Sequence, residues 1–323
     1  MRIACALFAL VVASVAGAGA PGVTKLKKPA RVFQMRTSRF SVPTGEREIC
    51  QAVRLPITKP VDVDRITVRM PTGSTLSSHH FAMFLAEATA PNLPLDGPKD
   101  NVGCAGVGGA LVSPILAFVQ RIGGDVIKFP KGVGVTLSPN QVLLFNSHWV
   151  NVSDAPVEVD VAVNFRKARR GSVKQHAKSF QLGTLNIDVP PGERGSVTSE
   201  WVVPFPMSLV WASSHSHKHT ESVDVDAIVG GAVQSLVRTT SYAEPDFSYF
   251  TPPDLRLVPG DVIRWTCRYR NGTEKPVTFG VTAEDEMCFA VGFFVTDDDG
   301  PIPPLPPSSL CFGADLGLVC PVN

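Results

Sequence analysis

The sequence predicts an all-β protein with two tandem antiparallel β-sandwich domains of the jelly-roll-like kind, followed by a Pro-rich C-terminal tail. Short apolar runs that alternate with polar residues recur along the chain, for example at residues 65–70 and 157–165, and this period of two is typical of strands. The 28 Pro and 27 Gly residues supply turn signals between such runs. Helical periodicity is scarce, and only residues 109–119 are compatible with a short helix. Many short strands joined by turns favour β-sandwiches.

The 323 residues are enough for two domains of ordinary size. We expect the first domain at residues 31–168 and the second at residues 178–296, because each range holds its own set of strand-like runs. The basic and polar residues 166–178 are interpreted as the connection between the domains. In the tail, residues 297–323, the Pro-rich segment is expected to be extended, polyproline-like chain.

The N-terminus has the pattern of a secretory signal peptide at residues 1–18. Arg2 forms a short positive region, residues 4–15 are apolar, and residues 16–18 fit a cleavage site of small residues. The apolar run is too short to span a bilayer, and no later stretch is long enough. We therefore predict a secreted protein, or one of the secretory-pathway lumen, with no membrane partner; an uncleaved N-terminal anchor is the alternative.

Cysteines and sequence motifs for glycosylation agree with an oxidising compartment. Six cysteines remain when Cys5 leaves with the signal peptide: Cys50, Cys104, Cys267, Cys288, Cys311 and Cys320. This even number predicts three disulfides, and the count alone allows about fifteen pairings. Asn151 and Asn271 lie in Asn-x-Ser/Thr motifs, which are acceptors for glycosylation in secreted proteins.

The charges are nearly balanced, with 30 Lys and Arg residues against 29 Asp and Glu residues and a formal net charge of +1. A chain with neither a basic nor an acidic excess has no overall field that attracts nucleic acid, so we expect no nucleic-acid partner. Hydrophobic residues make up 44% of the chain, which is enough for a packed core.

His215 and His217 form a His-x-His motif between an apolar run at residues 207–211 and a second strand-like run. Residues i and i+2 of a strand share a face, so the two imidazoles can lie side by side as half of a metal site. His219 would share that face if the strand continued, so spacing alone leaves open whether it is a ligand. Hydrogen-bonded histidines without a metal are the alternative interpretation.

A second histidine group consists of the adjacent pair His79-His80 and of His148, which lies on another predicted strand. Neighbours on a regular strand point to opposite faces, so both members of the pair can bind one metal only where the backbone is irregular. Three imidazoles without a thiolate suit Cu or Zn. Met287 offers a thioether, a soft ligand that favours Cu(I), although core packing is its alternative role. His176, in the basic connection, is expected to be solvated.

The chain resembles the copper type II, ascorbate-dependent monooxygenases, the family of peptidylglycine α-hydroxylating monooxygenase and dopamine β-monooxygenase. The resemblance covers roughly residues 33–296 and rests on motifs that occur in the family's order. These motifs are His79-His80 before an apolar strand, the loop Phe129-Pro-Lys-Gly-Val-Gly134, residues 143–151 around His148, His215-Ser-His217, and Glu286-Met287-Cys288.

The resemblance implies two copper ions, one in each domain, that face each other across an aqueous cleft. The electron-transfer copper would be held by His79, His80 and His148. The copper that binds O2 would be held by the catalytic ligands His215, His217 and Met287. Ascorbate would reduce both ions, and a C–H bond of the substrate would be hydroxylated with O2.

The resemblance also implies particular disulfides. The family joins the methionine segment to an upstream strand, so Cys267 is expected to pair with Cys288. Cys50 is expected to pair with Cys104, on either side of the His79-His80 strand. These two pairs leave Cys311 with Cys320, which would close a small loop in the tail.

Four positions depart from the pattern of the peptide-amidating enzymes. Ser213 stands where those enzymes have an Arg that binds the substrate carboxylate, and Phe289 and Val291 stand where they have Asn and Tyr. Asn146 replaces a Gln two residues before the third histidine. Because an apolar pair cannot anchor a carboxylate, a less polar substrate than a peptidylglycine is expected.

The leading hypothesis is therefore a secreted copper monooxygenase that acts on an unknown small-molecule or peptide substrate with O2 and ascorbate. A non-catalytic extracellular copper-binding or interaction protein of the same fold is the first alternative. A zinc site that serves hydrolysis or structure is the second, and the missing carboxylate ligand and the position of Met287 speak against it.

Overall fold

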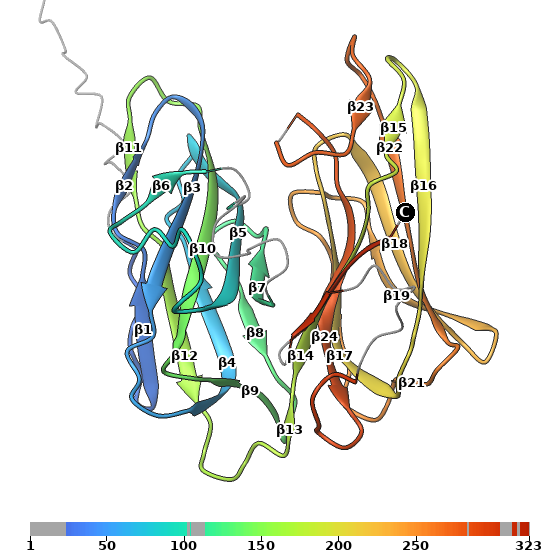
Figure 1. Cartoon of the computed structure of the whole chain (residues 1–323). Helices are drawn as coiled ribbons and strands as arrows, with labels where there is room; N and C mark the ends of the chain where they lie inside the picture. Colours follow the sequence, from blue (N-terminus) through green and yellow to red (C-terminus); the bar gives the residue numbers. More distant parts are fainter. Residues whose placement is uncertain are drawn as a thin grey trace, which may run out of the picture.

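The computed structural model describes residues 24–101, 104, 114–282 and 284–303, together with the backbone of residues 312–314 and 317–322. These residues form mostly antiparallel sheets and no α-helix, which confirms the predicted all-β sandwich class. Two sets of sheets lie side by side, β1–β13 in one and β14–β26 in the other (Figure 1). None of the described segments forms a helix long and apolar enough to cross a membrane.

The N-terminal set consists of two main sheets and one short pair. The first sheet has the order β1 (Val32–Arg36), β12 (Ala162–Lys167), β4 (Val61–Arg69), β9 (Val133–Leu137) and β13 (Gln175–His176), with β8 (Val126–Lys128) beside β4. The second has the order β6 (Lys99–Asp100), β3 (Gly45–Arg54), β10 (Gln141–Asn151), β5 (Leu76–Glu87) and β7 (Ile115–Val119). The short pair is β2 (Phe40–Val42) with β11 (Val157–Val159).

The C-terminal set repeats this plan. One sheet has the order β20 (Phe247–Tyr249), β17 (Met207–Ser216), β24 (Cys288–Thr296), β14 (Lys178–Thr184), β26 (Gly317–Val322) and β25 (Phe312–Ala314), with β21 (Arg256–Leu257) beside β17. The other has the order β16 (Arg194–Val202), β22 (Val262–Arg270), β18 (Thr220–Val229) and β19 (Ala232–Thr239). A short pair joins β15 (Asp188–Val189) to β23 (Val277–Thr278).

The chain passes from one set to the other at Ala177, between β13 and β14. No described sheet mixes strands from the two sets. The end of the basic connection at residues 166–178 is therefore part of the fold, because β13 pairs in parallel with β9. The C-terminal tail also adds structure, since β26 lies in parallel beside β14 and extends the C-terminal sheet.

Strands β17 and β24 are buried on both faces. On β24, Ala290 and Phe294 pack into the core of the C-terminal set. Val291 and Phe293 pack instead into a core that is continuous with the N-terminal set. Phe129 of the N-terminal set meets Phe293 edge-on, with ring centroids 5.3 Å apart. The near-continuous apolar sequence of these strands is thus explained by burial on both faces, since the two sets dock through sheet faces.

Residues 115–119 form β7, so the short helix considered for residues 109–119 is wrong over this part; residues 109–113 lie outside the described residues. The segment is a short apolar run, and periodicity alone does not distinguish such a strand from a buried helical turn. The segment forms a strand because it pairs with β5, where Phe81 and Ala82 lie opposite Val119 and Phe118.

Two of the three expected disulfides are present, Cys50–Cys104 and Cys267–Cys288. The first links β3 to the segment before β7, and the second links β22 to the start of β24. The third expected pair, Cys311 with Cys320, lies outside the residues whose side chains are described, as does the expected signal peptide at residues 1–18.

Each of the two glycosylation motifs forms a turn, one in each set of sheets, and the Asn side chain stabilises it. Asn151 is fully buried, and its Nδ2 donates to the carbonyl oxygens of Val42 at 3.0 Å and Ala155 at 2.9 Å. Asn271 repeats this arrangement after β22, with its Nδ2 donating to Lys275 O at 2.7 Å and to two other carbonyl oxygens. The following Ser or Thr hydroxyl donates to the Asn side-chain oxygen in both turns. Neither amide is exposed for a glycan, which argues against the expected glycosylation.

Candidate metal centre

His79 and His80 lie on β5, next to His148 on β10. His148 lies opposite His80 and Trp149 lies opposite Ser78, so His79 is the additional residue of a β-bulge. The irregular backbone that two adjacent ligands require is therefore present. The ring of His148 lies 4.9 Å from that of His79 and 5.4 Å from that of His80, centroid to centroid. Ligand atoms of the three histidines lie within 4.8 Å of one another.

A short chain of buried hydrogen bonds fixes the tautomer of His80. Asn146 Nδ2 donates to Glu48 Oε1 at 2.7 Å, which turns Asn146 Oδ1 toward His80 Nε2 at 2.6 Å. Because an amide oxygen only accepts, His80 Nε2 carries the hydrogen and Nδ1 keeps a free lone pair. That Nδ1 is buried without a hydrogen-bond partner among the described residues, and so is Nε2 of His79. Buried, unpartnered imidazole nitrogens are what a metal site requires of its ligands.

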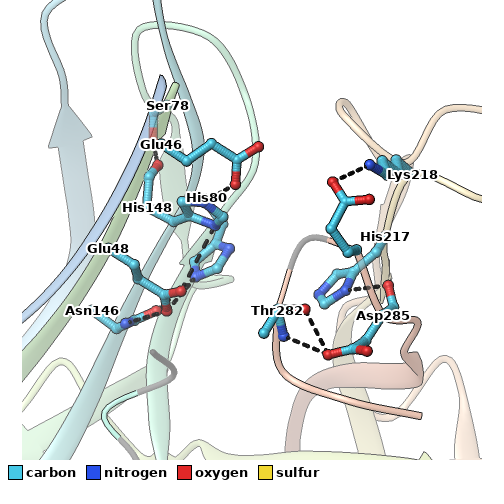
Figure 2. A network of polar contacts seen from close by, with 11 residues as sticks. Glu46, Glu48, Ser78, His80, Asn146, His148, His217, Lys218, Thr282 and Asp285 are labelled. Atoms are coloured by element: carbon cyan, nitrogen blue, oxygen red, sulfur yellow. Dashed lines mark hydrogen bonds and ion pairs between the residues drawn. The ribbon is translucent and has the colours of Figure 1, made fainter. Parts of the chain in front are cut away.

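Two carboxyl groups lie beside this histidine group, those of Glu46 and Glu48 (Figure 2). Glu46 Oε2 lies 3.1 Å from His148 Nε2, and its side chain is half exposed. The side chain of Glu48 is buried, with Oε1 3.7 Å from His80 Nε2 and Oε2 3.8 Å from His148 Nδ1. A buried carboxyl group therefore lies beside two of the three histidines.

The second histidine group comes from the end of β17. His215 follows Trp211 and Ser213 in the alternation that faces the N-terminal set, where its ring centroid lies 4.5 Å from that of Phe118. His217 follows directly after the strand, with its ring centroid 5.2 Å from that of His215. The His-x-His motif thus presents two imidazoles together, as its spacing predicted.

Hydrogen bonds also fix the tautomers of this second pair. Gln120 Nε2 donates to the carbonyl oxygen of Tyr242 at 2.9 Å, so its Oε1 is left to accept from His215 Nδ1 at 3.2 Å. His217 Nδ1 donates to the carbonyl oxygen of Asp285 at 3.0 Å (Figure 2). In both residues Nδ1 carries the hydrogen, which leaves Nε2 available to a metal.

Glu286 ties the histidine turn to the methionine segment. Its fully buried carboxyl group accepts from the backbone N–H groups of His217 at 3.0 Å, His219 at 2.6 Å and Met287 at 3.2 Å, and from the Thr220 hydroxyl at 3.1 Å. Burial raises the pKa of Glu286 to about 7, against the lowering effect of these donors. The same carboxyl group therefore sets the positions of both the His-x-His motif and Met287.

His219 does not continue the face of the His-x-His motif. β17 ends at Ser216, and the N–H of Thr220 donates to the carbonyl oxygen of His217 at 3.2 Å in a turn. His219 is not among the residues that line the cavity described below. His176 is also remote from the two groups, because its Nδ1 pairs with Asp299 Oδ2 at 2.7 Å rather than being simply solvated.

The two histidine groups lie close to each other in this structure. Figure 2 shows His80 and His148 of the first group facing His217 of the second. The ring centroids of His79 and His217 lie 5.9 Å apart, and those of His80 and His215 lie 6.0 Å apart. The expected separation of the two sites by an aqueous cleft is therefore not observed. The contact follows from the docking of the β17–β24 face against the β5–β7 edge of the N-terminal set.

A cavity of about 110 Å³ lies between the two groups and is lined from both sides. His80, His215, His217 and Met287 contribute to its wall. Apolar side chains make up most of the remainder, namely Ala82, Phe84, Ile115, Phe118, Val281, Phe289 and Val291. Met287 is half-buried rather than sealed in the core, and the adjacent disulfide at Cys288 holds its segment to β22.

Burial keeps four of the histidines neutral, namely His79, His80, His215 and His217. Burial, together with the neighbouring His148 and His217, lowers the pKa of His79 to about 3. Burial is also the main cause that lowers the pKa of His80, His215 and His217 below the ordinary value. Metal ions bind the neutral form of imidazole, so the neutral state and the unpartnered nitrogens both fit a metal centre.

Sequence reasoning found the six candidate ligands but missed the residues that orient them. Glu48 and Gln120 gave no signal, because a single Glu or Gln on an apolar strand is not part of a recognisable motif. The sequence distinguishes Glu286 only as the neighbour of Met287. The donation of the Ser213 hydroxyl to Asp246 O at 2.8 Å was also not foreseeable, and it directs that side chain to the edge strand.

The fold and the site define a two-part β-sandwich protein with a histidine-rich candidate metal centre. Residues 200–297 match the family model described as copper type II ascorbate-dependent monooxygenase, C-terminal domain. This match confirms the resemblance for that part of the chain. The match indicates copper- and ascorbate-dependent oxidation as the kind of function.

Other comparisons add no functional information. No curated protein sequence matches the chain. Among solved structures, the infectious bursal disease virus VP2 subviral particle has 8% identity and a TM-score of 0.21, and covers 86% of this chain and 75% of its own. The Macrobrachium rosenbergii nodavirus structure has 10% identity and a TM-score of 0.18, with 91% and 97% covered. Likenesses at this level carry no conclusion about the chain.

Proposed function

We propose that the protein is a secreted copper monooxygenase that hydroxylates a C–H bond in an apolar group of a small-molecule or peptide substrate, using O2 and ascorbate. The observation that carries the proposal is the convergence of neutral, tautomer-fixed histidines and Met287 on one apolar cavity. The match of residues 200–297 to the monooxygenase family supports the same chemistry.

Two ligand sets are proposed, one from each set of sheets. The first consists of His79, His80 and His148, whose ligand atoms lie close together. The second consists of His215, His217 and Met287, which share the cavity wall. Copper, when bound, supplies one-electron redox chemistry and reactivity toward O2, and ascorbate supplies the electrons. A thioether in the second set favours Cu(I) there.

The chain itself supplies orientation and a dry environment. Asn146, Gln120 and the Asp285 carbonyl hold their imidazoles in single tautomers, so the ligand nitrogens are oriented before a metal binds. Apolar walls keep water away from the reacting C–H bond, which limits side reactions.

The cavity favours an uncharged substrate group. Phe118, Phe289 and Val291 face the space beside the second ligand set, and no Arg or Lys occurs among the described residues that line it. A substrate carboxylate would be desolvated there without a partner, at a large energetic cost. The cavity volume of about 110 Å³ suits a small apolar group rather than a bulky one.

Secretion is part of the proposal. The two disulfides of the described residues are typical of proteins from oxidising compartments. The signal-peptide pattern of residues 1–18 predicts the same location.

The test combines metal analysis with turnover. Mature protein is loaded with copper, freed of excess metal and analysed for bound ions, and its oxygen uptake with ascorbate is followed in a substrate screen by mass spectrometry. Two bound copper ions and a product heavier by one oxygen atom are expected. His148→Ala is expected to lose one ion, keep the other and lose coupled product formation. Zinc retained in preference to copper, or two bound copper ions without any product across the screen, would contradict the proposal.

A further inference from the structure

An open groove that shares no residue with the metal cavity lies where the two sets of sheets join. Its volume is about 940 Å³. One wall is the loop between β8 and β9, residues 129–132, and the opposite wall is the basic connection after β12, including Arg169 and Lys174. Arg31 and Thr251 complete the lining, so residues before β1 and in the C-terminal set both contribute.

The groove is strongly cationic although the whole chain has a net charge of only +1. Six basic side chains line it: Arg31, Lys128, Lys131, Arg166, Arg169 and Lys174. The one acidic residue in the lining, Asp64, is already paired with Arg166 at 2.5 Å. The other five basic side chains are exposed and form no ion pair with any described residue.

Backbone hydrogen bonds hold the walls of the groove in place. The N–H groups of Lys174 and Gln175 both donate to the carbonyl oxygen of Gly132, at 2.7 and 3.1 Å. Gly132 has a φ of +88°, a conformation that favours glycine at this turn. The N–H of Lys167 donates to Arg31 O at 2.7 Å, which ties the N-terminal segment to the same wall. The cations are therefore presented by a preformed frame, which lowers the entropic cost of binding.

Clustered cations without counter-ions repel one another and gain most from a ligand that carries several negative charges. A single phosphate or carboxylate would engage only a few of the five and fill little of about 940 Å³. A ligand with several anionic groups matches both the number of cations and the volume of the groove. Release of its counter-ions on binding would add to the affinity.

The lining also distinguishes between classes of polyanion. Single-stranded nucleic acids use aromatic side chains as stacking platforms for bases. Phe129 is the aromatic residue of this lining, and it is buried against Phe293 and therefore closed to stacking. The disulfides indicate an oxidising compartment, in which sulfated sugars are the common polyanions. We propose that this groove binds a sulfated polysaccharide.

The test measures binding of a defined heparin hexasaccharide to the full protein by calorimetry at several salt concentrations. The double variant Lys131→Glu/Lys174→Glu reverses one cation on each wall, and we expect it to weaken binding at least about tenfold and to reduce the salt dependence. The matched control is Lys275→Glu, which reverses an exposed Lys in the turn between β22 and β23, at the other end of the molecule from β13 (Figure 1). The control is expected to bind within about twofold of the wild type.

Three results would overturn the proposal. The first is that the wild type does not bind the hexasaccharide at low salt. The second is that the double variant and the control weaken binding equally. The third is that an RNA oligonucleotide of equal charge binds the groove more tightly than the hexasaccharide. A milder pair, Lys131→Gln and Lys174→Gln, keeps the test valid if charge reversal disturbs folding, because each is expected to weaken binding without lowering the thermal midpoint.

Discussion

The imidazole rings of His80 and His215 lie with their centroids 6.0 Å apart, although His80 belongs to β5 and His215 to β17. No described sheet joins these strands, so the contact depends on how the two sets of sheets dock. Phe118 mediates it, because its ring lies 5.7 Å from that of His80 and 4.5 Å from that of His215. Access to the cavity therefore depends on the interface between the sets as well as on each ligand group.

Glu48 is expected to favour the oxidised ion at the first ligand set. The isosteric change Glu48→Gln removes a buried carboxyl group beside His80 and His148, and the ionised form of this group attracts Cu(II) more strongly than Cu(I). We expect Cu(II) affinity to fall about tenfold relative to Cu(I) affinity, which corresponds to a rise of about 59 mV in the reduction potential.

Glu46→Gln is the matched control for this measurement. Glu46 also lies beside His148, but its half-exposed carboxylate is screened by solvent, so the shift is expected to be clearly smaller. Competition titrations with Cu(II) and Cu(I) chelators give the ratio of the Cu(II) affinity to the Cu(I) affinity directly. Equal shifts of the affinity ratio in the two variants, or no shift in Glu48→Gln, would show that burial of the Glu48 carboxyl group has no effect on the ion.

Gln120 is expected to control copper binding at the second ligand set by orienting His215. Gln120→Leu removes the acceptor of the His215 Nδ1 hydrogen and should lower the copper affinity of this set about 10–100-fold. Gln120→Glu replaces the amide oxygen by a carboxylate oxygen, which can still accept from His215 Nδ1, and should keep most of the affinity. If both variants bind copper as weakly as each other, packing around Gln120 rather than the hydrogen bond is responsible.

The metal-free protein is expected to lose stability as the pH falls below about 6.5. The folded-state pKa of His79 is lowered to about 3, so between these values the unfolded chain binds more protons than the folded one. Stability from the neutral histidine is therefore present above pH 6.5 and is lost progressively toward pH 3. The thermal midpoint measured with a chelator should fall between pH 7.5 and 5, and less steeply in His79→Gln. Parallel curves for the two proteins would contradict the buried, neutral state of His79.

The fold and the candidate ligands were predictable for physical reasons. Alternation of apolar and polar residues reports burial on one face of a strand, which is a local property. The His-x-His spacing places His215, near the end of β17, and His217, directly after the strand, on one side of the extended chain for the same reason. The adjacent pair His79-His80 required an irregular strand, and the bulge at His79 supplies it.

The orienting residues were not predictable, because each acts across a long sequence separation. Gln120 reaches His215, and Glu48 reaches His80 through Asn146, only after strands from distant parts of the chain have paired and docked. The buried turns at Asn151 and Asn271 were unpredictable for a related reason, because the same short pattern is also the motif for glycosylation. Local patterns predict which strand a residue occupies but not which partner it meets.

The proposed role of Met287 decides whether the cavity is an oxygen-reactive copper site. Met287→Ile conserves much of the side-chain volume, so loss of packing should cost no more than about 1.5 kcal/mol of stability. His215 and His217 would remain to bind Cu(II) more weakly, while Cu(I) would lose its soft ligand. Oxygen uptake with ascorbate should therefore fall far more than stability does.

X-ray absorption of copper in the ascorbate-reduced protein tests this role most directly. A copper–sulfur contribution is expected in the wild type, and it should vanish in Met287→Ile while the copper–nitrogen contribution of the histidines remains. A wild-type spectrum without the sulfur contribution, or a variant spectrum that retains it, would contradict the assignment of Met287 as a ligand and with it the proposed oxygen-reactive site.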